Sequence, residues 1–220
     1  SASVAAGIFD LSGGTLSTTG DSTFGGAGTL RFTSGTISGI GRLTVNAGFD
    51  WSAGTQSGLG VTRLNGESRI LSGGTKALNR TLEISGSTRV DTPSGTVQIQ
   101  DSGRLSVLDT GQLEIVGGSS ISHLGSGRLD NAGLMRKTGT AGLTLAMPLT
   151  NIGTLRIESG TLTASAFPVN AGTLDVFDSA ALITANNSLQ NNGVIQGGGA
   201  INLGAGTLTN AGALRPGNGA

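Results

Sequence analysis

Short alternations of apolar and polar residues recur along the chain about every twenty positions. Complete copies read apolar, polar, apolar at residues 30–32, 113–115, 155–157 and 174–176. Because the side chains of a strand point alternately to its two faces, each copy predicts a short β-strand with one buried and one exposed face. These copies begin two residues after a glycine of one recurring series: Gly7, Gly28, Gly48, Gly66, Gly86, Gly111, Gly133, Gly153, Gly172, Gly193 and Gly212.

Two further segments of each repeat show the same alternation. One follows a second series of glycines and often begins with threonine and an apolar residue; this series is Gly14, Gly35, Gly54, Gly74, Gly95, Gly117, Gly139 and Gly160. The other precedes the next glycine of the first series, at residues 42–45, 81–84, 104–107 and 207–209. Each repeat is therefore predicted to contain three short strands.

Three strands and three corners in one repeat cannot bury an apolar face alone, but identical units stacked on one another form continuous parallel sheets around a shared core. The sequence predicts an all-β fold: a right-handed parallel β-helix (β-solenoid) of about 10–11 rungs, each of ~20 residues and three short strands. No change of composition marks a linker, so residues 1–220 are expected to form a single domain. The chain begins and ends abruptly, as a fragment of a longer chain would.

Glycine and asparagine are expected at the corners, because both tolerate the left-handed backbone conformations of sharp turns. An asparagine recurs two residues before a glycine of the first series, at Asn46, Asn131, Asn151, Asn170, Asn191 and Asn210. Side-chain amides stacked in a column can hydrogen-bond from one rung to the next. We interpret this column as a structural ladder rather than as a ligand site.

Composition narrows the classes of function. The 220 residues include 40 Gly and no Cys, and 13 Lys+Arg balance 13 Asp+Glu. A neutral chain lacks the basic surface expected of a nucleic-acid-binding protein, so no nucleic-acid partner is predicted. No apolar run is long enough for a membrane-spanning helix and no signal-peptide pattern is present, so the chain is not expected to be embedded in a membrane. Without Cys, disulfides and thiolate metal sites are excluded.

Candidate catalytic groups are few. His123 is the only histidine, and no second metal ligand or triad partner accompanies it in the sequence, so we expect it at a corner or on the surface. Lyases and glycosidases with a β-helix place paired acids in a cleft, for which the candidates are Asp10 with Asp50 and Asp175 with Asp178. Rungs of nearly constant length leave little chain to form the walls of a cleft. We therefore predict no enzyme activity and no cofactor.

One column of the predicted strands is rich in charge. It contains the residues three positions after each glycine of the first series, which are flanked by core positions: Asp10, Arg31, Trp51, Arg69, Arg89, Glu114, Arg136, Arg156, Asp175, Gln196 and Arg215. The column predicts either a solvated face that keeps the rod soluble or a strip that binds a sulfated or carboxylated glycan or an acidic protein surface. For the second interpretation the binding residues are Arg69, Arg89, Arg136 and Arg156, with an exposed Trp51 as an aromatic anchor.

Two segments show the style of the repeat best: residues 206–218 (Gly-Thr-Leu-Thr-Asn-Ala-Gly-Ala-Leu-Arg-Pro-Gly-Asn) and residues 149–157 (Leu-Thr-Asn-Ile-Gly-Thr-Leu-Arg-Ile). This style, which extends over nearly the whole chain, resembles the β-helix repeats of bacterial autotransporter passengers and of two-partner-secretion exoproteins of the filamentous haemagglutinin group. The resemblance implies a rod displayed on or released from a Gram-negative cell, commonly an adhesin. The chain departs from that pattern because it contains no recognisable secretion domain or protease motif.

The leading hypothesis is a non-enzymatic β-solenoid stalk or adhesive segment of an exported bacterial surface protein, located outside the cell or on its surface. The expected partners are a glycan or protein of a host or cell surface, or further copies of the chain associating end to end or laterally. One alternative is a carbohydrate-active β-helix enzyme, which predicts a groove with clustered acids. Another is an ice-binding solenoid, which predicts a regular plane of threonines built from pairs such as Thr161 with Thr163 and Thr207 with Thr209.

Overall fold

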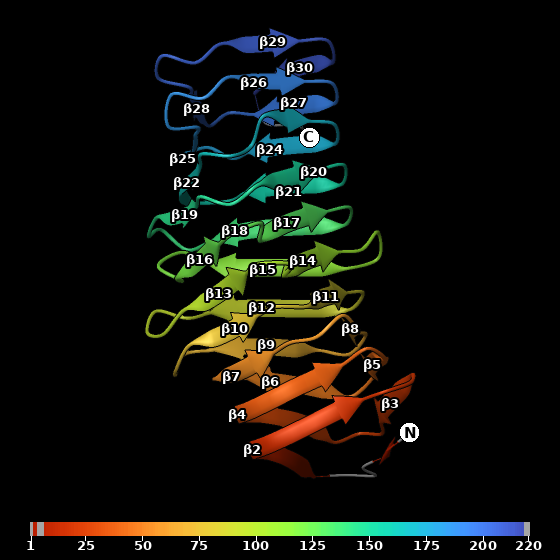
Figure 1. Ribbon diagram of the computed structural model, residues 1–220. Helices are drawn as coiled ribbons and strands as arrows, with labels where there is room; N and C mark the ends of the chain where they lie inside the picture. The colour runs from red at the N-terminus through yellow and green to blue at the C-terminus, as the bar shows by residue number, and fades with distance from the viewer. Residues whose placement is uncertain (1, 4–6, 218–220) are drawn as a thin grey trace.

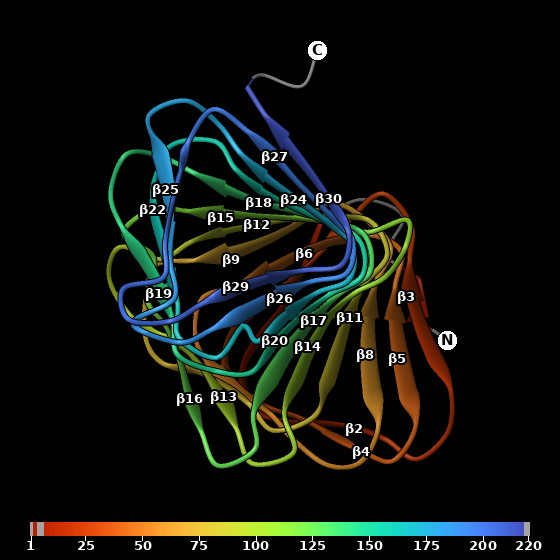
Figure 2. The same cartoon turned by 90° about the horizontal axis from the view of Figure 1, so that it is seen from above.

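The computed structural model describes residues 2–3 and 7–217, which form thirty β-strands and no helix. The strands stack into one elongated rod that runs from β2 near one end to β29 at the other (Figure 1). Viewed along the rod, the chain coils around a common interior with its strands in successive rungs lying over one another (Figure 2). The strands that pair one rung apart are parallel, which confirms the predicted β-solenoid with about twenty residues and three strands per rung.

The first face of the coil is a sheet of 11 strands, one from each successive rung. It contains the segments predicted to precede the glycines of the first series. Its strands are β1 (Ala2–Ser3), β3 (Ser22–Gly25), β5 (Arg42–Val45), β8 (Val61–Leu64), β11 (Thr81–Ile84), β14 (Arg104–Val107), β17 (Arg128–Asn131), β20 (Leu149–Asn151), β23 (Val169–Asn170), β26 (Leu189–Asn191) and β29 (Leu208–Asn210).

The second face contains the apolar, polar, apolar triplets. Its strands are β2 (Ile8–Thr18), β4 (Thr29–Gly39), β6 (Gly48–Trp51), β9 (Ser68–Leu71), β12 (Ser87–Asp91), β15 (Gln112–Val116), β18 (Leu134–Thr138), β21 (Thr154–Ile157), β24 (Thr173–Val176), β27 (Val194–Gly197) and β30 (Ala213–Pro216). Strands β2 and β4 are long enough to continue onto the third face, because β4 pairs with both β6 and β7.

The third face is divided in two. Strands β7 (Gly54–Gln56), β10 (Lys76–Leu78), β13 (Val97–Gln100) and β16 (Ile121–Leu124) continue the sheet of the second face through β4. Strands β19 (Leu143–Leu145), β22 (Gly160–Ala164), β25 (Ala180–Ile183) and β28 (Ala200–Asn202) form a separate sheet. Within the described chain no pairing joins β16 to β19, although the same two rungs pair on the other faces through β15 with β18 and β17 with β20. Figure 2 shows β13 and β16 displaced around the coil from β22 and β25.

Apolar side chains from all three faces fill the interior. Leu155 of β21 and Leu174 of β24 are fully buried and lie beside each other in register, as predicted. Aromatic residues gather in the N-terminal rungs, where the rings of Phe32 and Trp51 stack with their centroids 5.9 Å apart. The interior of these rungs therefore holds rings as well as the aliphatic side chains that fill the later rungs.

Two sequence predictions are wrong for one shared reason. Strand β4 pairs with β6 in a register that places Phe32 beside Trp51, so Ala47, not Gly48, occupies the first-series glycine position of this rung. Every assignment counted from Gly48 is consequently shifted by one residue. Trp51 is fully buried rather than exposed, and Asn46 is exposed and lies one residue beyond the asparagine column.

The remaining asparagines form the predicted ladder at the end of the first-face strands. Each side-chain Nδ2 donates to the Oδ1 of the next residue in the column, at 2.7 to 2.8 Å, in the order Asn131, Asn151, Asn170, Asn191 and Asn210. At the start of the ladder the Oδ1 of Asn131 is buried and accepts no hydrogen bond, because the neighbouring rung has Val107 at this position. The amides thus act on one another and on the backbone, which supports the structural interpretation of the column.

One glycine of each series shows two different reasons for glycine at a corner. Gly160, of the second series, has a φ of +66°, a conformation that strains any residue with a Cβ atom, as predicted for a corner. Gly172, of the first series, has no positive φ, but a Cβ there would lie 2.1 Å from the carbonyl oxygen of Gly153 in the preceding rung. Close stacking of the backbone, and not a left-handed conformation, therefore selects glycine at this corner.

Candidate functional site

The charged column predicted on the second face is present. The register of the paired strands places side by side Asp10, Arg31, Asp50, Arg69, Arg89, Glu114, Arg136, Arg156, Asp175, Gln196 and Arg215. We call this set the second-face column. The four arginines predicted as binding residues lie in it, whereas Asp50 takes the place that was predicted for Trp51.

Arginine and carboxylate side chains of the second-face column bind one another across rungs. Arg69 binds both carboxylate oxygens of Asp50, from Nε at 2.8 Å and from Nη2 at 2.6 Å. This hydrogen bonding raises the pKa of Arg69. Arg156 donates from Nε to Asp175 at 3.2 Å, and its guanidinium carbon lies 5.4 Å from the centre of the Phe177 ring. Each of these cations therefore already has an anionic partner.

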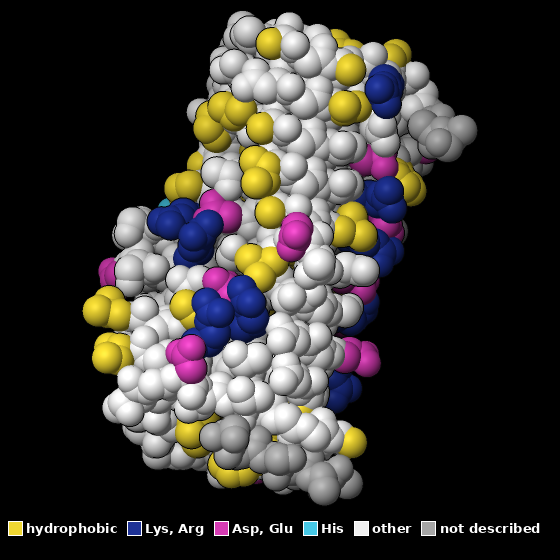
Figure 3. All heavy atoms as spheres, turned by 90° about the vertical axis from the view of Figure 1, so that its right-hand side faces the viewer, with side chains coloured by type: hydrophobic (Ala, Val, Ile, Leu, Met, Phe, Trp, Pro, Cys, Tyr) yellow, Lys and Arg dark blue, Asp and Glu magenta, His cyan; other side chains and the backbone are white. Residues whose placement is uncertain are grey.

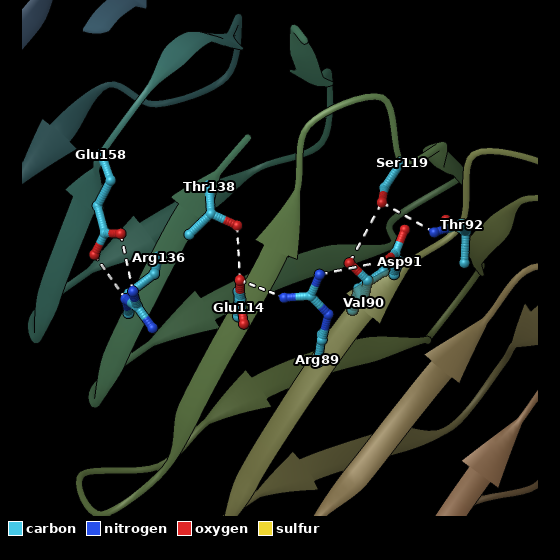
Figure 4. Close-up of polar contacts among 9 residues, drawn as sticks. All are labelled: Arg89, Val90, Asp91, Thr92, Glu114, Ser119, Arg136, Thr138 and Glu158. Atoms are coloured by element: carbon cyan, nitrogen blue, oxygen red, sulfur yellow. Dashed lines mark hydrogen bonds and ion pairs between the residues drawn. The ribbon is translucent and has the colours of Figure 1, made fainter. Parts of the chain in front are cut away.

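In the middle of the column each arginine binds a nearby carboxylate (Figure 4). Arg89 lies between Glu114, at 2.6 Å, and Asp91, at 3.3 Å, and Arg136 binds Glu158 through two hydrogen bonds of 2.7 and 2.9 Å. Burial opposes ionisation of Glu114, but the hydroxyl of Thr138 and the charge of Arg89 outweigh it and lower the pKa of this carboxyl. The middle of the second-face column is therefore matched in charge by its own and neighbouring carboxylates and is not a free cationic strip.

A second group of charges, which sequence reasoning missed, lies on the first face. It contains Arg42, Arg63, Arg104 and Arg128 with the carboxylates of Glu83 and Asp130. We call it the first-face arginine cluster; Figure 3 shows basic and acidic side chains gathered over these rungs, apart from the row of charges at the edge of the view. Applying the same inward and outward alternation to the segments at residues 42–45, 104–107 and 128–131 would have found it.

In this cluster each carboxylate is shared between two arginines. Arg63 donates to Glu83 at 2.8 Å, and Arg42 approaches the same oxygen at 3.9 Å. Arg104 and Arg128 both bind Oδ2 of Asp130, at 2.5 and 3.1 Å. Burial opposes ionisation of Asp130, but the hydroxyl of Thr150 and the neighbouring arginines lower its pKa.

Both lysines and one arginine point into the coil, which the sequence did not reveal. Lys76 donates to the carbonyl oxygens of Ser52 and Gly74, and Arg80 donates to those of Gly41 and Ser57. Burial lowers the pKa of each cation.

Lys137 behaves in the same way at the boundary between the two parts of the third face. It donates to the carbonyl oxygens of Gly139, Ala141 and Ser159, and burial lowers its pKa. These cations therefore hold corner carbonyl groups that lack strand partners, a role that a rule assigning charge to the surface cannot predict.

The interrupted third face leaves a cleft of about 520 Å³ between β16 and β19. His123 lines it, together with Ser122 and Thr144. His123 is aligned with the buried Ile99, so it occupies an inward position that becomes partly accessible where the pairing stops. Of the two predicted positions the corner is wrong, since His123 lies in strand β16, whereas its partial exposure in the cleft agrees with a surface position.

The carboxylates considered for catalysis are not brought together as a free pair. Asp10 and Asp50 lie on either side of Arg31 in register, and Asp175 binds Arg156 while Asp178 lies in the exposed turn after β24. No cluster of three or more His, Asp or Glu residues in the described ranges can hold a metal ion.

The threonine pairs considered for ice binding lie on different faces. Thr161 and Thr163 belong to β22 on the third face, whereas Thr209 belongs to β29 on the first face. A shared plane of threonines is therefore not formed by these pairs.

Comparison with known proteins gives no relative: no protein-family model, curated protein or solved structure matches this chain. No described segment forms a helix that is long and apolar enough to cross a membrane.

Proposed function

We propose that this chain is a non-enzymatic stalk or adhesive segment of an exported bacterial β-solenoid protein. The observation that carries the proposal is the first face, in which 11 strands pair in parallel without interruption from β1 to β29. Each rung is bound to the rung before and after it, so the coil forms a stiff spacer that displays the same strand positions at regular intervals. Such a surface suits an extended ligand or a row of contacts.

The chemistry of the outer faces supports a binding or structural role. The carboxylates of the second-face column form ion pairs with arginines, as Asp50 does with Arg69 and Asp175 with Arg156. A general acid or base needs a pKa near the working pH, whereas, despite burial, hydrogen bonds from Thr138 and Arg89 lower the pKa of Glu114 in this column. The repeat style at residues 149–157 and 206–218 supports export to the surface of a Gram-negative cell.

One panel of ligands tests the proposal against the enzyme alternative. The purified chain is immobilised and challenged with neutral and anionic polysaccharides and with host cell-surface proteins, and both retention and new reducing ends are measured. An adhesive segment retains at least one ligand and releases no product. Product formation that is lost in Asp50→Asn or Asp175→Asn would establish the enzyme instead, and the failure of every ligand to be retained would contradict the adhesive role.

A further inference from the structure

The first-face arginine cluster offers unused hydrogen-bond donors. Arg63, Arg104 and Arg128 each donate to a carboxylate through Nε alone, and the described residues provide no partner for their Nη groups. Arg69 and Arg136 of the second-face column instead bind both oxygens of a carboxylate. A guanidinium group bound in this two-point manner through Nε and Nη2 keeps its Nη1 hydrogens, but its charge is already matched by a carboxylate of its own. The two sets of arginines therefore differ in whether each guanidinium group has a carboxylate of its own or shares one with a neighbour.

The balance of charge points the same way. Two carboxylates, Glu83 and Asp130, serve four arginines, and both carboxylates are more buried than the arginines that cover them. The nearby Asp21 accepts a hydrogen bond from the backbone N–H of Arg42, and even with it the arginines outnumber the acids. This part of the first face is consequently cationic although the chain as a whole is neutral.

The arginines are spaced along the rod by whole rungs. The register places Arg42, Val61, Thr81, Arg104 and Arg128 in one column, with Arg63 in the parallel column two residues further along the strands. Because paired strands lie about 4.8 Å apart, Arg42 and Arg128 are separated by about 19 Å along the axis. A small anion can reach only one end of this cluster, whereas a linear polymer can contact both ends without any change in the protein.

We propose that the first-face arginine cluster binds a linear anionic polysaccharide laid along the rod. The proposal rests on the adhesive function proposed above and identifies its ligand class. It also moves the anion-binding site from the second face, where the sequence placed it, to the first face. Each contact is a charge-assisted hydrogen bond from an outward Nη group to a sulfate or carboxylate oxygen.

Two double variants that remove the same charge test this assignment. Arg63→Ala with Arg128→Ala alters the cluster, and Arg89→Ala with Arg136→Ala alters the second-face column. Binding of the full chain to immobilised heparin is measured at low and at moderate salt, with hyaluronate as a ligand that presents carboxylates alone. The cluster variant is expected to bind at least about tenfold more weakly at low salt and the control to change by less than about twofold, because the cluster has four arginines on two carboxylates whereas Arg89 and Arg136 each have carboxylates of their own.

Further arms make each outcome decisive. Arg63→Lys with Arg128→Lys keeps the charge and is expected to retain binding at low salt, and circular dichroism confirms that all variants fold. If the chain binds heparin but not hyaluronate, the site recognises sulfate groups. If it binds both, the site accepts either sulfate or carboxylate groups on a linear polymer. Three results would each overturn the proposal. They are an equal loss of heparin binding in the two alanine variants, a parent chain that binds neither heparin nor hyaluronate, and duplex DNA that competes for the chain as well as heparin does. If the parent and both variants bind a neutral glycan or a protein equally, the adhesive function stands without this site.

Discussion

The same inward column of the first face is filled in two ways along the rod. In the N-terminal rungs it holds the apolar side chains Phe24, Val45, Leu64, Ile84 and Val107, and in the C-terminal rungs it holds Asn131, Asn151, Asn170, Asn191 and Asn210. Both parts continue one sheet with parallel pairing. The backbone of the coil therefore accepts either chemistry at this position.

The difference lies in how each side chain is stabilised. An apolar residue gains free energy from its own removal from water, whichever apolar residue lies beside it. A buried amide must instead satisfy its donors and acceptor, and Asn151 does so by donating to Asn170 and to the carbonyl of Thr173 while accepting from Asn131. An asparagine in this column therefore has all its hydrogen bonds satisfied only when both neighbours in the stack are also asparagines, as Asn131 beside Val107 shows by contrast.

The corners of the two regions differ in a related way. Buried cations hold corner carbonyl groups in the N-terminal rungs, as Lys76 and Arg80 do, and Lys137 does so beside the interrupted third face. In the C-terminal rungs the ladder amides perform this task, since Asn170 donates to the carbonyls of Gly172 and Val194. Each region therefore satisfies its buried backbone acceptors with a different donor.

The largest effect is expected inside the ladder. Asn170→Ala removes donations to Gly172, Asn191 and Val194 and leaves the buried Oδ1 of Asn191 without its donor. We expect the free energy of unfolding to fall by about 3 to 5 kcal/mol, because several buried hydrogen bonds are lost at once. Urea unfolding followed by circular dichroism measures the change.

Asn210 provides the control for this prediction. It is the last residue of the ladder and is exposed, so Asn210→Ala is expected to cost less than about 1 kcal/mol. Equal costs at Asn170 and Asn210 would show that the amides act independently of their place in the stack.

A smaller effect concerns the cations that hold the corners. Burial lowers the pKa values of Lys76 and Lys137, so in alkaline solution the folded chain releases these protons at a lower pH than the unfolded chain does. Because the unfolded state then binds more protons, stability rises with pH until the unfolded lysines also titrate. The chain contains no Tyr and no Cys, so no other side chain titrates in this window.

The measurement is the urea midpoint between pH 8 and pH 10, which is expected to rise for the parent chain. Lys76→Met with Lys137→Met is expected to remove this dependence. A midpoint that falls or stays constant in the parent chain would contradict the lowered pKa values of these two lysines.

The smallest effects are expected on the outer surface of both regions. Arg69 lies in the N-terminal part and Arg156 in the C-terminal part, and each forms an ion pair with an aspartate. Arg69→Ala and Arg156→Ala are each expected to change the free energy of unfolding by less than about 1 kcal/mol, because partly exposed ion pairs are weak. A large loss at only one of the two sites would show that the regions differ on their surface as well as in the inner column.

The sequence predicted the strands because two periodicities agree: alternation within a strand and a glycine about every twenty residues. The glycine count failed at Gly48, where glycine stands one residue after the equivalent corner position and only the apolar pattern of Phe49 and Trp51 marks the true register. The buried lysines were not predictable, since their carbonyl partners come from corners that the chain brings together only on coiling. The interruption between β16 and β19 has no local signal apart from the longer rungs on either side of residue 115.

The first-face arginine cluster was missed for a different reason. Its charges alternate with apolar residues in the segments at residues 42–45 and 104–107, as those of the second-face column do. The sequence could not reveal how the charges pair. A guanidinium group can bind one carboxylate at two points or share a carboxylate with a neighbour, and the choice depends on side-chain geometry across three or more rungs.

The most direct test of the central claim places the same substitution at two points of the inner column. Val45 and Val107 are both fully buried, but Val45 lies between Phe24 and Leu64, whereas Val107 adjoins Asn131, whose buried Oδ1 has no donor. Val107→Asn supplies that donor and extends the ladder by one rung, so the free energy of unfolding is expected to fall by less than about 1 kcal/mol. Val45→Asn buries an amide that has no amide neighbour, so the free energy of unfolding is expected to fall by about 3 kcal/mol or more. Urea midpoints that separate the two variants in this order support a column whose amides depend on their neighbours, and equal losses at the two sites would contradict it.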